Sequence, residues 1–217
     1  MTVVSKDSGI DSAEDLAGEK VVVSGEKTAS TLFFEIGLKE ADLEPGGNEY
    51  FVSGTGPGMV GVLESGDVDV AATYVPYAAD MVLKDIGTVL FTGSDVLGAD
   101  APGDGFIASQ AFAEEHSDAV DDVVRAQMKA TDFITESPDD AYSLMAEFAD
   151  VDAEAVKYSF DEELVSVAPT YVPDSEGLAK VAARAQELGF SPSDDIDLTE
   201  FVTDFVNTEF AERAQKD

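Results

Sequence analysis

The chain has 217 residues, of which 44% are hydrophobic, and it contains no cysteine. This length allows one good core or two modest ones, and the lack of cysteine excludes disulfides, thiolate metal sites and cysteine nucleophiles. Forty-six acidic residues against twelve Lys and Arg give a formal net charge of −34. Because no basic patch is present to displace counterions, nucleic acid is excluded as a partner.

The acidic residues are spread over almost every segment and form no separate tail. A compact chain of this size has a radius of gyration of roughly 17 Å, so its net charges lie about one Debye length apart in physiological salt. Self-repulsion is then appreciable in ordinary buffer and nearly absent in molar salt. The composition therefore predicts an acidic, halophilic protein.

The first part of the chain alternates predicted strands and helices, as is typical of a parallel α/β sheet. Leu32, Phe33 and Ile36 give the first helix its apolar faces, with Thr28 as its expected cap. Strands are expected at 2–5, 20–24, 50–52, 68–74, 88–91 and 105–109, and helices at 30–40, 57–63 and 78–84.

After Ser109 the pattern becomes helical, with no Gly/Ser linker to mark a flexible tether. Helices are expected at 117–135, 138–148, 152–160, 175–188 and 198–214. No apolar run approaches the roughly 20 residues that a membrane helix requires. The first residues of the sequence have neither the basic region nor the apolar region of an export signal.

Several segments in a fixed order carry a resemblance to a known family. They are Lys6-Asp7-Ser8-Gly9-Ile10, Asp15-Leu16-Ala17-Gly18-Glu19-Lys20-Val21, Lys27-Thr28-Ala29-Ser30-Thr31 and Ser65-Gly66-Asp67-Val68-Asp69-Val70-Ala71-Ala72 before Tyr74-Val75-Pro76. This order resembles the solute-binding proteins of ABC importers, of the nitrate/sulfonate/taurine type. The resemblance implies an α/β fold of the periplasmic binding protein-like type II class, with a mixed, mainly parallel sheet and a helical C-terminal half.

The resemblance also implies two lobes. Residues 1–109 would form an α/β lobe with crossover strands at about 2–6 and 105–109, and residues 110–217 would be helices packing on the other lobe. In the family, further residues precede this order and build the front of the first lobe. We therefore expect that lobe to be incomplete here, and the uncovered apolar faces to cause self-association, a ligand affinity well below that of a complete relative, or both.

The segment from Lys27 to Thr31 is the first candidate for ligand binding. Thr28, Ser30 and Thr31 place hydroxyls at a predicted helix start, where the helix dipole favours an anion. The family uses the corresponding loop to hold sulfonate or nitrate groups, and Lys27 would add a cation. The alternative interpretation is a simple helix cap.

A glycine-rich loop is the second candidate, through Gly54, Thr55 and Gly56. Residues 56–61 formally match the G-x-G-x-x-G pattern of dinucleotide-binding folds. Such a fold needs an acidic residue at the end of the next strand, whereas that strand ends in Thr73-Tyr74. A tight loop with exposed N–H groups is the preferred interpretation.

Two tyrosines complete the set of candidates. Tyr74 and Tyr77 surround Pro76, where the family often has a Trp-x-Pro segment at the mouth of the ligand cleft. An aromatic side chain there can stack on an organic solute or can simply pack. Asp104, before the expected return strand, would suit a cationic or neutral ligand better than an anion.

An enzyme is the alternative class. The single histidine, His116, precedes a helix start and is interpreted as a solvated helix-end residue, and no Ser/His/Asp set or His pair for zinc can be assembled. A related pyrimidine-synthesising branch depends on Cys and His, and the cysteines are missing here. Carboxylates such as Asp118, Asp121 and Asp122 lack an EF-hand pattern. No catalytic residue, metal or cofactor is predicted.

The sequence therefore predicts a solute-binding component that captures a small anion or small organic molecule, such as sulfonate, nitrate or taurine. Its partner would be an ABC permease in the membrane, and hinge closure between lobes would trap the solute. The resemblance implies an extracellular or membrane-anchored location for the full-length protein. An enzyme and a dinucleotide-binding protein are the disfavoured alternatives.

Overall fold

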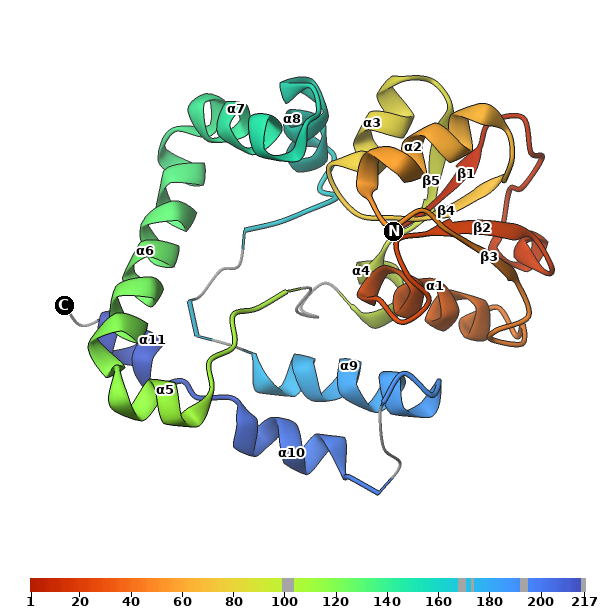
Figure 1. Cartoon of the computed structure of the whole chain (residues 1–217). Coiled ribbons are helices and arrows are strands. Elements are labelled where there is room, and N and C mark those ends of the chain that lie inside the picture. The colour runs from red at the N-terminus through yellow and green to blue at the C-terminus, as the bar shows by residue number, and fades with distance from the viewer. Residues whose placement is uncertain (99–103, 168–170, 173, 192–194, 216–217) are drawn as a thin grey trace.

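The computed structural model describes residues 1–98, 104–167, 171–172, 174–191 and 195–215. Within these residues the strands all lie in the first part of the chain, and helices follow (Figure 1). The strands are β1 Thr2–Ser5, β2 Lys20–Val23, β3 Glu49–Val52, β4 Val70–Ala72 and β5 Gly87–Phe91.

The strands form one mixed sheet in the order β3-β2-β4-β1-β5. β2 is parallel to both β3 and β4, whereas β1 is antiparallel to β4 and β5. Four strands therefore run in one direction and β1 runs against them. The expected mixed, mainly parallel sheet is confirmed.

Helices cover both faces of the sheet because successive side chains of a strand point to opposite faces. Val21 packs with Phe34 and Leu38 on one face, and Val22 packs with Met59 and Met81 on the other. The elements that join the strands are the short helix η1 Ala13–Leu16 and the helices α1 Ala29–Glu40, α2 Gly56–Ser65 and α3 Tyr77–Leu83, and α4 Gly93–Leu97 follows β5. As a result, α1 lies on one face of the sheet, and α2 and α3 lie on the other (Figure 1).

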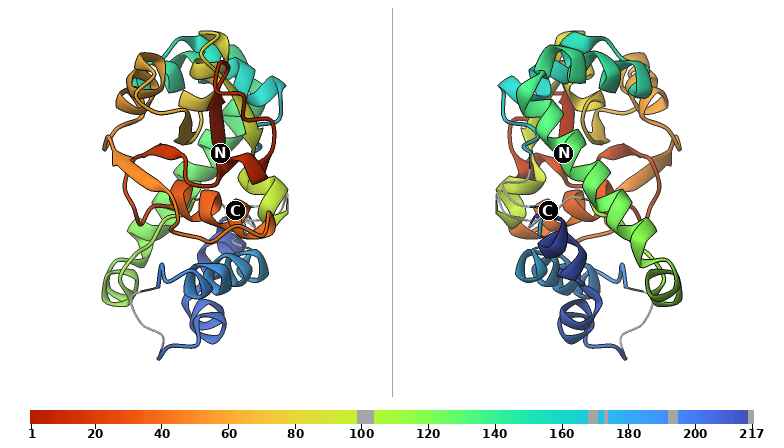
Figure 2. Two further views of the ribbon diagram at one scale, coloured as in Figure 1. Left: turned by 90° about the vertical axis from the view of Figure 1, so that its right-hand side faces the viewer. Right: turned by 90° about the vertical axis from the view of Figure 1, so that its left-hand side faces the viewer.

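The remaining helices form a bent row that contacts the α/β part at two places. α8 packs against α3, and α9 runs beside α1 (Figures 1 and 2). The ion pairs Lys39–Glu187 and Arg184–Glu40 join α9 to α1. The helices are α5 Gln110–Glu115, α6 Ser117–Glu136, α7 Pro138–Ala149, α8 Ala153–Asp161, α9 Ser175–Glu187, α10 Leu198–Phe205 and α11 Glu209–Ala214. In the part of the chain that the structure describes, none of the helices has the length and apolar character needed to cross a membrane.

Two expected elements differ from the structure. Residues 105–109 are irregular instead of forming a strand, and Phe106 and Ile107 are 78% and 82% exposed. A strand needs a neighbour to pair its N–H and C=O groups, and β5 and β3 end the sheet without these residues. The expected helix over 198–214 is interrupted between α10 and α11. The division into two lobes at about residue 109 stays a prediction.

Candidate functional site

Three of the candidate segments follow three neighbouring strands. β2, β3 and β4 are parallel and in register, so that Val23 lies beside both Val52 and Ala72. The segments 24–28, 53–55 and 73–76 therefore leave the sheet at the same edge. The chain from β2 turns to one face through α1, while the chains from β3 and β4 turn to the other face through α2 and α3. In open α/β sheets, ligands bind outside the carboxyl ends of the strands at such a switch point.

Three hydroxyls gather at the start of α1. The Thr28 hydroxyl donates to the Gly25 carbonyl at 3.0 Å and lies 3.2 Å from Ser30 Oγ and 3.1 Å from Thr31 Oγ1. Thr31 also donates to the Gly25 carbonyl, at 2.7 Å, and is fully buried. The first N–H groups of a helix lack intrahelical partners, so this cluster sits beside free donors.

Thr28 occupies the N-cap position of α1, but its side chain accepts no hydrogen bond from the helix N–H groups. The expectation that its hydroxyl caps the helix is therefore wrong. The physical reason is that its hydroxyl is turned toward the Gly25 carbonyl and the two neighbouring hydroxyls. Thr28 thus stabilises the loop conformation, and Ser30, at 8% exposure, is nearer to the surface than Thr31.

Lys27 points away from the hydroxyl cluster toward α9. Its ammonium donates to the Gly189 carbonyl at 2.9 Å and lies 4.3 Å from the ring centroid of Phe190. Both contacts come from residues directly after α9 in the chain. The role of Lys27 as a ligand cation stays a prediction, and in the structure its ammonium has other partners.

The glycine-rich loop has its own internal bonds. Thr55 caps α2, because its hydroxyl accepts from the Gly58 N–H at 3.2 Å, and Ser53 Oγ donates to the Thr55 carbonyl at 2.9 Å. Gly54 has φ of +77°, a conformation that glycine adopts without steric cost. The loop is fixed by these contacts, and it lies at the edge where β3 ends.

The two tyrosines differ in exposure and partners. Tyr74 and Tyr77 pack edge to face, with ring centroids 5.3 Å apart at 86°. Tyr74 is 42% exposed, so its ring can contact a solute. Tyr77 lies against Gly56, and its hydroxyl donates to the Ala149 carbonyl at 2.9 Å. Tyr77 therefore lies between the candidate loops and the end of α7.

Sequence reasoning missed two threonines at the same sheet edge. Thr2 lies beside Ala72, which precedes Thr73, and both threonines are fully buried. Within the described residues, neither hydroxyl has a hydrogen-bond partner. A buried hydroxyl without a partner is costly. The signal in the sequence was a threonine placed where a buried strand meets a loop.

The other polar groups singled out from the sequence have structural roles. His116 lies between α5 and α6, as the helix-end interpretation predicted, with its ring 4.9 Å from that of Phe112. Asp121 accepts from Arg213 at 2.7 Å, and Asp122 accepts from Arg125 at 2.8 Å. Among the described residues, no group of three or more His, Cys, Asp or Glu side chains is arranged to hold a metal ion.

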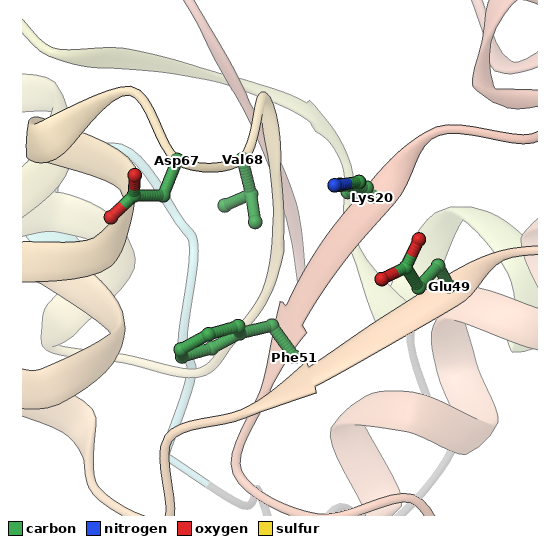
Figure 3. A pocket seen from close by; sticks show the side chains of 5 residues that line it. All are labelled: Lys20, Glu49, Phe51, Asp67 and Val68. Carbon is green, nitrogen blue, oxygen red and sulfur yellow. The ribbon is translucent and has the colours of Figure 1, made fainter.

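A separate pocket of about 340 Å³ lies near the amino ends of β2 and β3. It is lined by Lys20, Glu49, Phe51, Asp67 and Val68 (Figure 3). Lys20 and Glu49 begin their strands, so this pocket lies at the opposite edge of the sheet from the candidate loops. It contains none of the predicted site residues.

Comparisons with solved structures define the fold class. The aliphatic sulphonate binding protein SsuA from Escherichia coli is 21% identical, with 97% of this chain and 63% of that chain covered and a TM-score of 0.67. The nitrate-binding protein NrtA from Synechocystis PCC 6803 is 12% identical, with 99% and 64% covered and a TM-score of 0.79. The fold is therefore α/β, of the periplasmic binding protein-like type II class.

A family model described as NMT1/THI5 like matches residues 1–141, well over half of the chain. The chain belongs to this family. No curated protein matches its sequence. An enzyme also shares the fold: the desulfurization enzyme DSZB is 18% identical, with 99% of this chain and 75% of that chain covered and a TM-score of 0.62. The chain spans less than two thirds of the length of the sulphonate- and nitrate-binding structures.

Proposed function

We propose that the chain binds a small solute, an anion or small organic molecule of the sulfonate, nitrate or taurine kind, for an ABC importer. The observation that carries this proposal is the meeting of three loops at the switch point of the sheet, after β2, β3 and β4. They bring hydroxyls at the start of α1, N–H groups of the glycine-rich loop and the exposed ring of Tyr74 to one edge. Hydroxyls and N–H groups suit an oxyanion, and an aromatic ring suits an organic body.

The neighbours in structure support this proposal. The E. coli protein is named for aliphatic sulphonate and the Synechocystis protein for nitrate, and both are periplasmic. By analogy, we propose an extracellular or cell-surface location and delivery of the solute to a membrane permease. Binding without catalysis is preferred over a DSZB-like enzyme, because the chain has no cysteine nucleophile and its described residues contain no group of three or more His, Cys, Asp or Glu arranged to hold a metal ion.

Calorimetric titration tests the proposal. The panel is nitrate, taurine, short alkanesulfonates and a pyrimidine, measured in molar KCl so that the acidic chain is well screened. We expect at least one member to bind. Ser30→Ala should then weaken its binding from a few-fold to about a hundredfold, because one hydrogen bond to the solute is lost.

Ser143→Ala is the matched control, since Ser143 is exposed on α7 and bonds only to its own helix, at the Asp139 carbonyl. It should leave the affinity unchanged. Binding by none of the panel would refute the proposed solute class. Binding that Ser30→Ala leaves intact would move the site away from the start of α1. Chemical change of a bound compound during incubation would favour the enzyme.

A further inference from the structure

Tyr77 connects the loops after β3 and β4 to the end of α7. It is the first residue of α3 and directly follows the loop after β4. A Cβ placed on Gly56 would lie 2.0 Å from its ring, so the ring lies directly against the backbone of the glycine-rich loop. The same ring packs edge to face on Tyr74. One side chain thus touches both loops that follow β3 and β4.

The other end of the Tyr77 side chain reaches a segment far away in sequence. Its hydroxyl donates to the carbonyl of Ala149, the last residue of α7, 72 residues further along the chain. The last carbonyls of a helix have no partner within the helix, so the tyrosine supplies a bond that α7 cannot make by itself. The pKa of Tyr77 is raised mainly by burial, and to a smaller extent by the nearby Tyr74 and Asp150. The hydroxyl therefore keeps its proton and remains a donor at neutral pH.

Charged groups surround this junction. A cavity of about 170 Å³ lies between α2, α3 and the turn after α7, and it is bordered by Glu64, Asp80, Lys84 and Asp150 as well as Tyr77. Lys84 pairs with Asp80 at 2.7 Å, and its ammonium also attracts Glu64 and Asp152. The hydrogen bond from the neutral Tyr77 hydroxyl joins the two sides without adding a further charge.

We propose that Tyr77 is a positioning residue: it fixes the loops after β3 and β4 against the end of α7, and thereby couples the solute site to the helical part of the chain. This inference rests on the proposed function for its effect on binding. The claim that Tyr77 fixes the orientation of α7 relative to the sheet does not depend on the proposed function. A preorganised loop binds more tightly because less freedom is lost on binding.

Tyr77→Phe tests the inference, since it keeps the ring and removes only the hydroxyl. The chain has no native cysteine, so spin labels can be placed at Glu14→Cys in η1 and Glu147→Cys in α7, both exposed positions. We expect pulsed electron resonance to show a broader distance distribution between the labels in Tyr77→Phe. Calorimetry with the solute that binds the parent chain should show an affinity about two- to tenfold lower, the effect of one neutral hydrogen bond.

Two further variants complete the design. Tyr142→Phe is the matched control, because Tyr142 lies on α7 itself and stacks on Phe160, and it should change neither measurement. Gly56→Ala must displace the Tyr77 ring, and it should reproduce the broader distribution with the hydroxyl still present. A distance distribution in Tyr77→Phe equal to that of Tyr142→Phe would overturn the inference, whatever the solutes do.

The two proposals fail in different ways. If the distribution broadens and the solute affinity stays at the parent value, the coupling to the site is refuted while solute binding stands. If no member of the panel binds the parent chain, the proposed function fails and the coupling to the site fails with it. The distance measurement then still decides whether Tyr77 positions α7.

Discussion

Hydroxyl groups at the carboxyl edge of the sheet differ in whether they have hydrogen-bond partners. Thr28, Ser30 and Thr31 share hydrogen bonds with one another and with the Gly25 carbonyl. Thr73, directly after β4, is as fully buried as Thr31, but its hydroxyl has no partner among the described residues. The first arrangement stabilises a loop. The second costs free energy unless a bound molecule completes it.

We predict that Thr73→Val raises the free energy of unfolding by about 1 kcal/mol, because valine has the same shape and removes a buried hydroxyl without a partner. Thermal or denaturant unfolding in molar KCl measures the change. Thr2→Val offers a second test, since Thr2 is also fully buried with an unpaired hydroxyl. Thr31→Val is the contrasting variant: its hydroxyl is bonded to the Gly25 carbonyl, so the same substitution should destabilise.

If Thr73→Val lowers the stability, a partner for the hydroxyl must exist, such as a buried water. If it stabilises the chain and also weakens solute binding, the hydroxyl contributes to the site. Either result assigns a role to a residue that the sequence pattern did not single out.

At the scale of elements, α9 is held to α1 by basic side chains, which are scarce in this chain. Lys39 pairs with Glu187, Arg184 pairs with Glu40, and Arg184 also pairs with Glu187 at 3.1 Å. The hydrogen bond from Lys39, and next the one from Arg184, lower the pKa of Glu187. Partly exposed ion pairs are individually weak, but a connected network is worth more. Lys27 adds a contact just beyond α9.

We predict that Lys27→Met loosens the end of α9. Methionine keeps the apolar stem but loses both the bond to the Gly189 carbonyl and the cation–π contact with Phe190, together worth about 1 kcal/mol. Hydrogen exchange measured by mass spectrometry should therefore speed up in peptides that cover 184–190.

Lys129→Met removes the same charge from an exposed position on α6, and it controls for the change in net charge. A result with unchanged exchange around α9 but strongly weakened anion binding would instead make Lys27 a ligand residue. The family resemblance led us to expect that role.

For the whole molecule, the net charge of −34 opposes the compact state through self-repulsion. The junction at α3 and α7 has carboxylates on both sides, and the chain has 46 acidic residues against 12 Lys and Arg. At molar salt the Debye length is only about 3 Å, so charges that lie farther apart than this hardly repel one another. The fold is therefore expected to depend on salt.

We predict that the melting midpoint rises steeply between 0.1 and 3 M KCl. The gain in the free energy of unfolding should be on the order of several kcal/mol, because the folded chain concentrates charges that the unfolded chain separates. Circular dichroism melts across the salt series measure it. A midpoint that stays constant would contradict the halophilic interpretation of the composition.

Light scattering over the same series tests the expected self-association. Large apolar side chains are exposed in the part of the chain after residue 104, and they include Phe106, Ile107, Phe112, Val123, Leu144, Phe148, Phe201 and Phe205. Screening should let such faces associate, so we expect mass to increase with salt. A monomer at all salt concentrations would contradict this expectation.

The sequence by itself determined most local structure, because the signals are local. The valine runs predicted β2, and the apolar periodicity with a polar residue ahead of it predicted α1, α6 and α7 to within a few residues. The order of strands, helices and short motifs also indicated the family and the mixed sheet, both of which are confirmed. These features depend on residues that are near one another in the chain.

Only the tertiary structure decided which groups meet across long separations. A strand at 105–109 would need a neighbouring strand, and none lies beside these residues in the sheet, so its β-prone residues stay irregular. Lys27 finds its partner 162 residues away and Tyr77 finds its partner 72 residues away. The side chain of Thr28 makes its hydrogen bonds with a loop carbonyl and two hydroxyls instead of with the helix N–H groups. Which groups pair depends on which potential partners lie close together in the folded chain. The spacing of residues along the sequence does not contain that information.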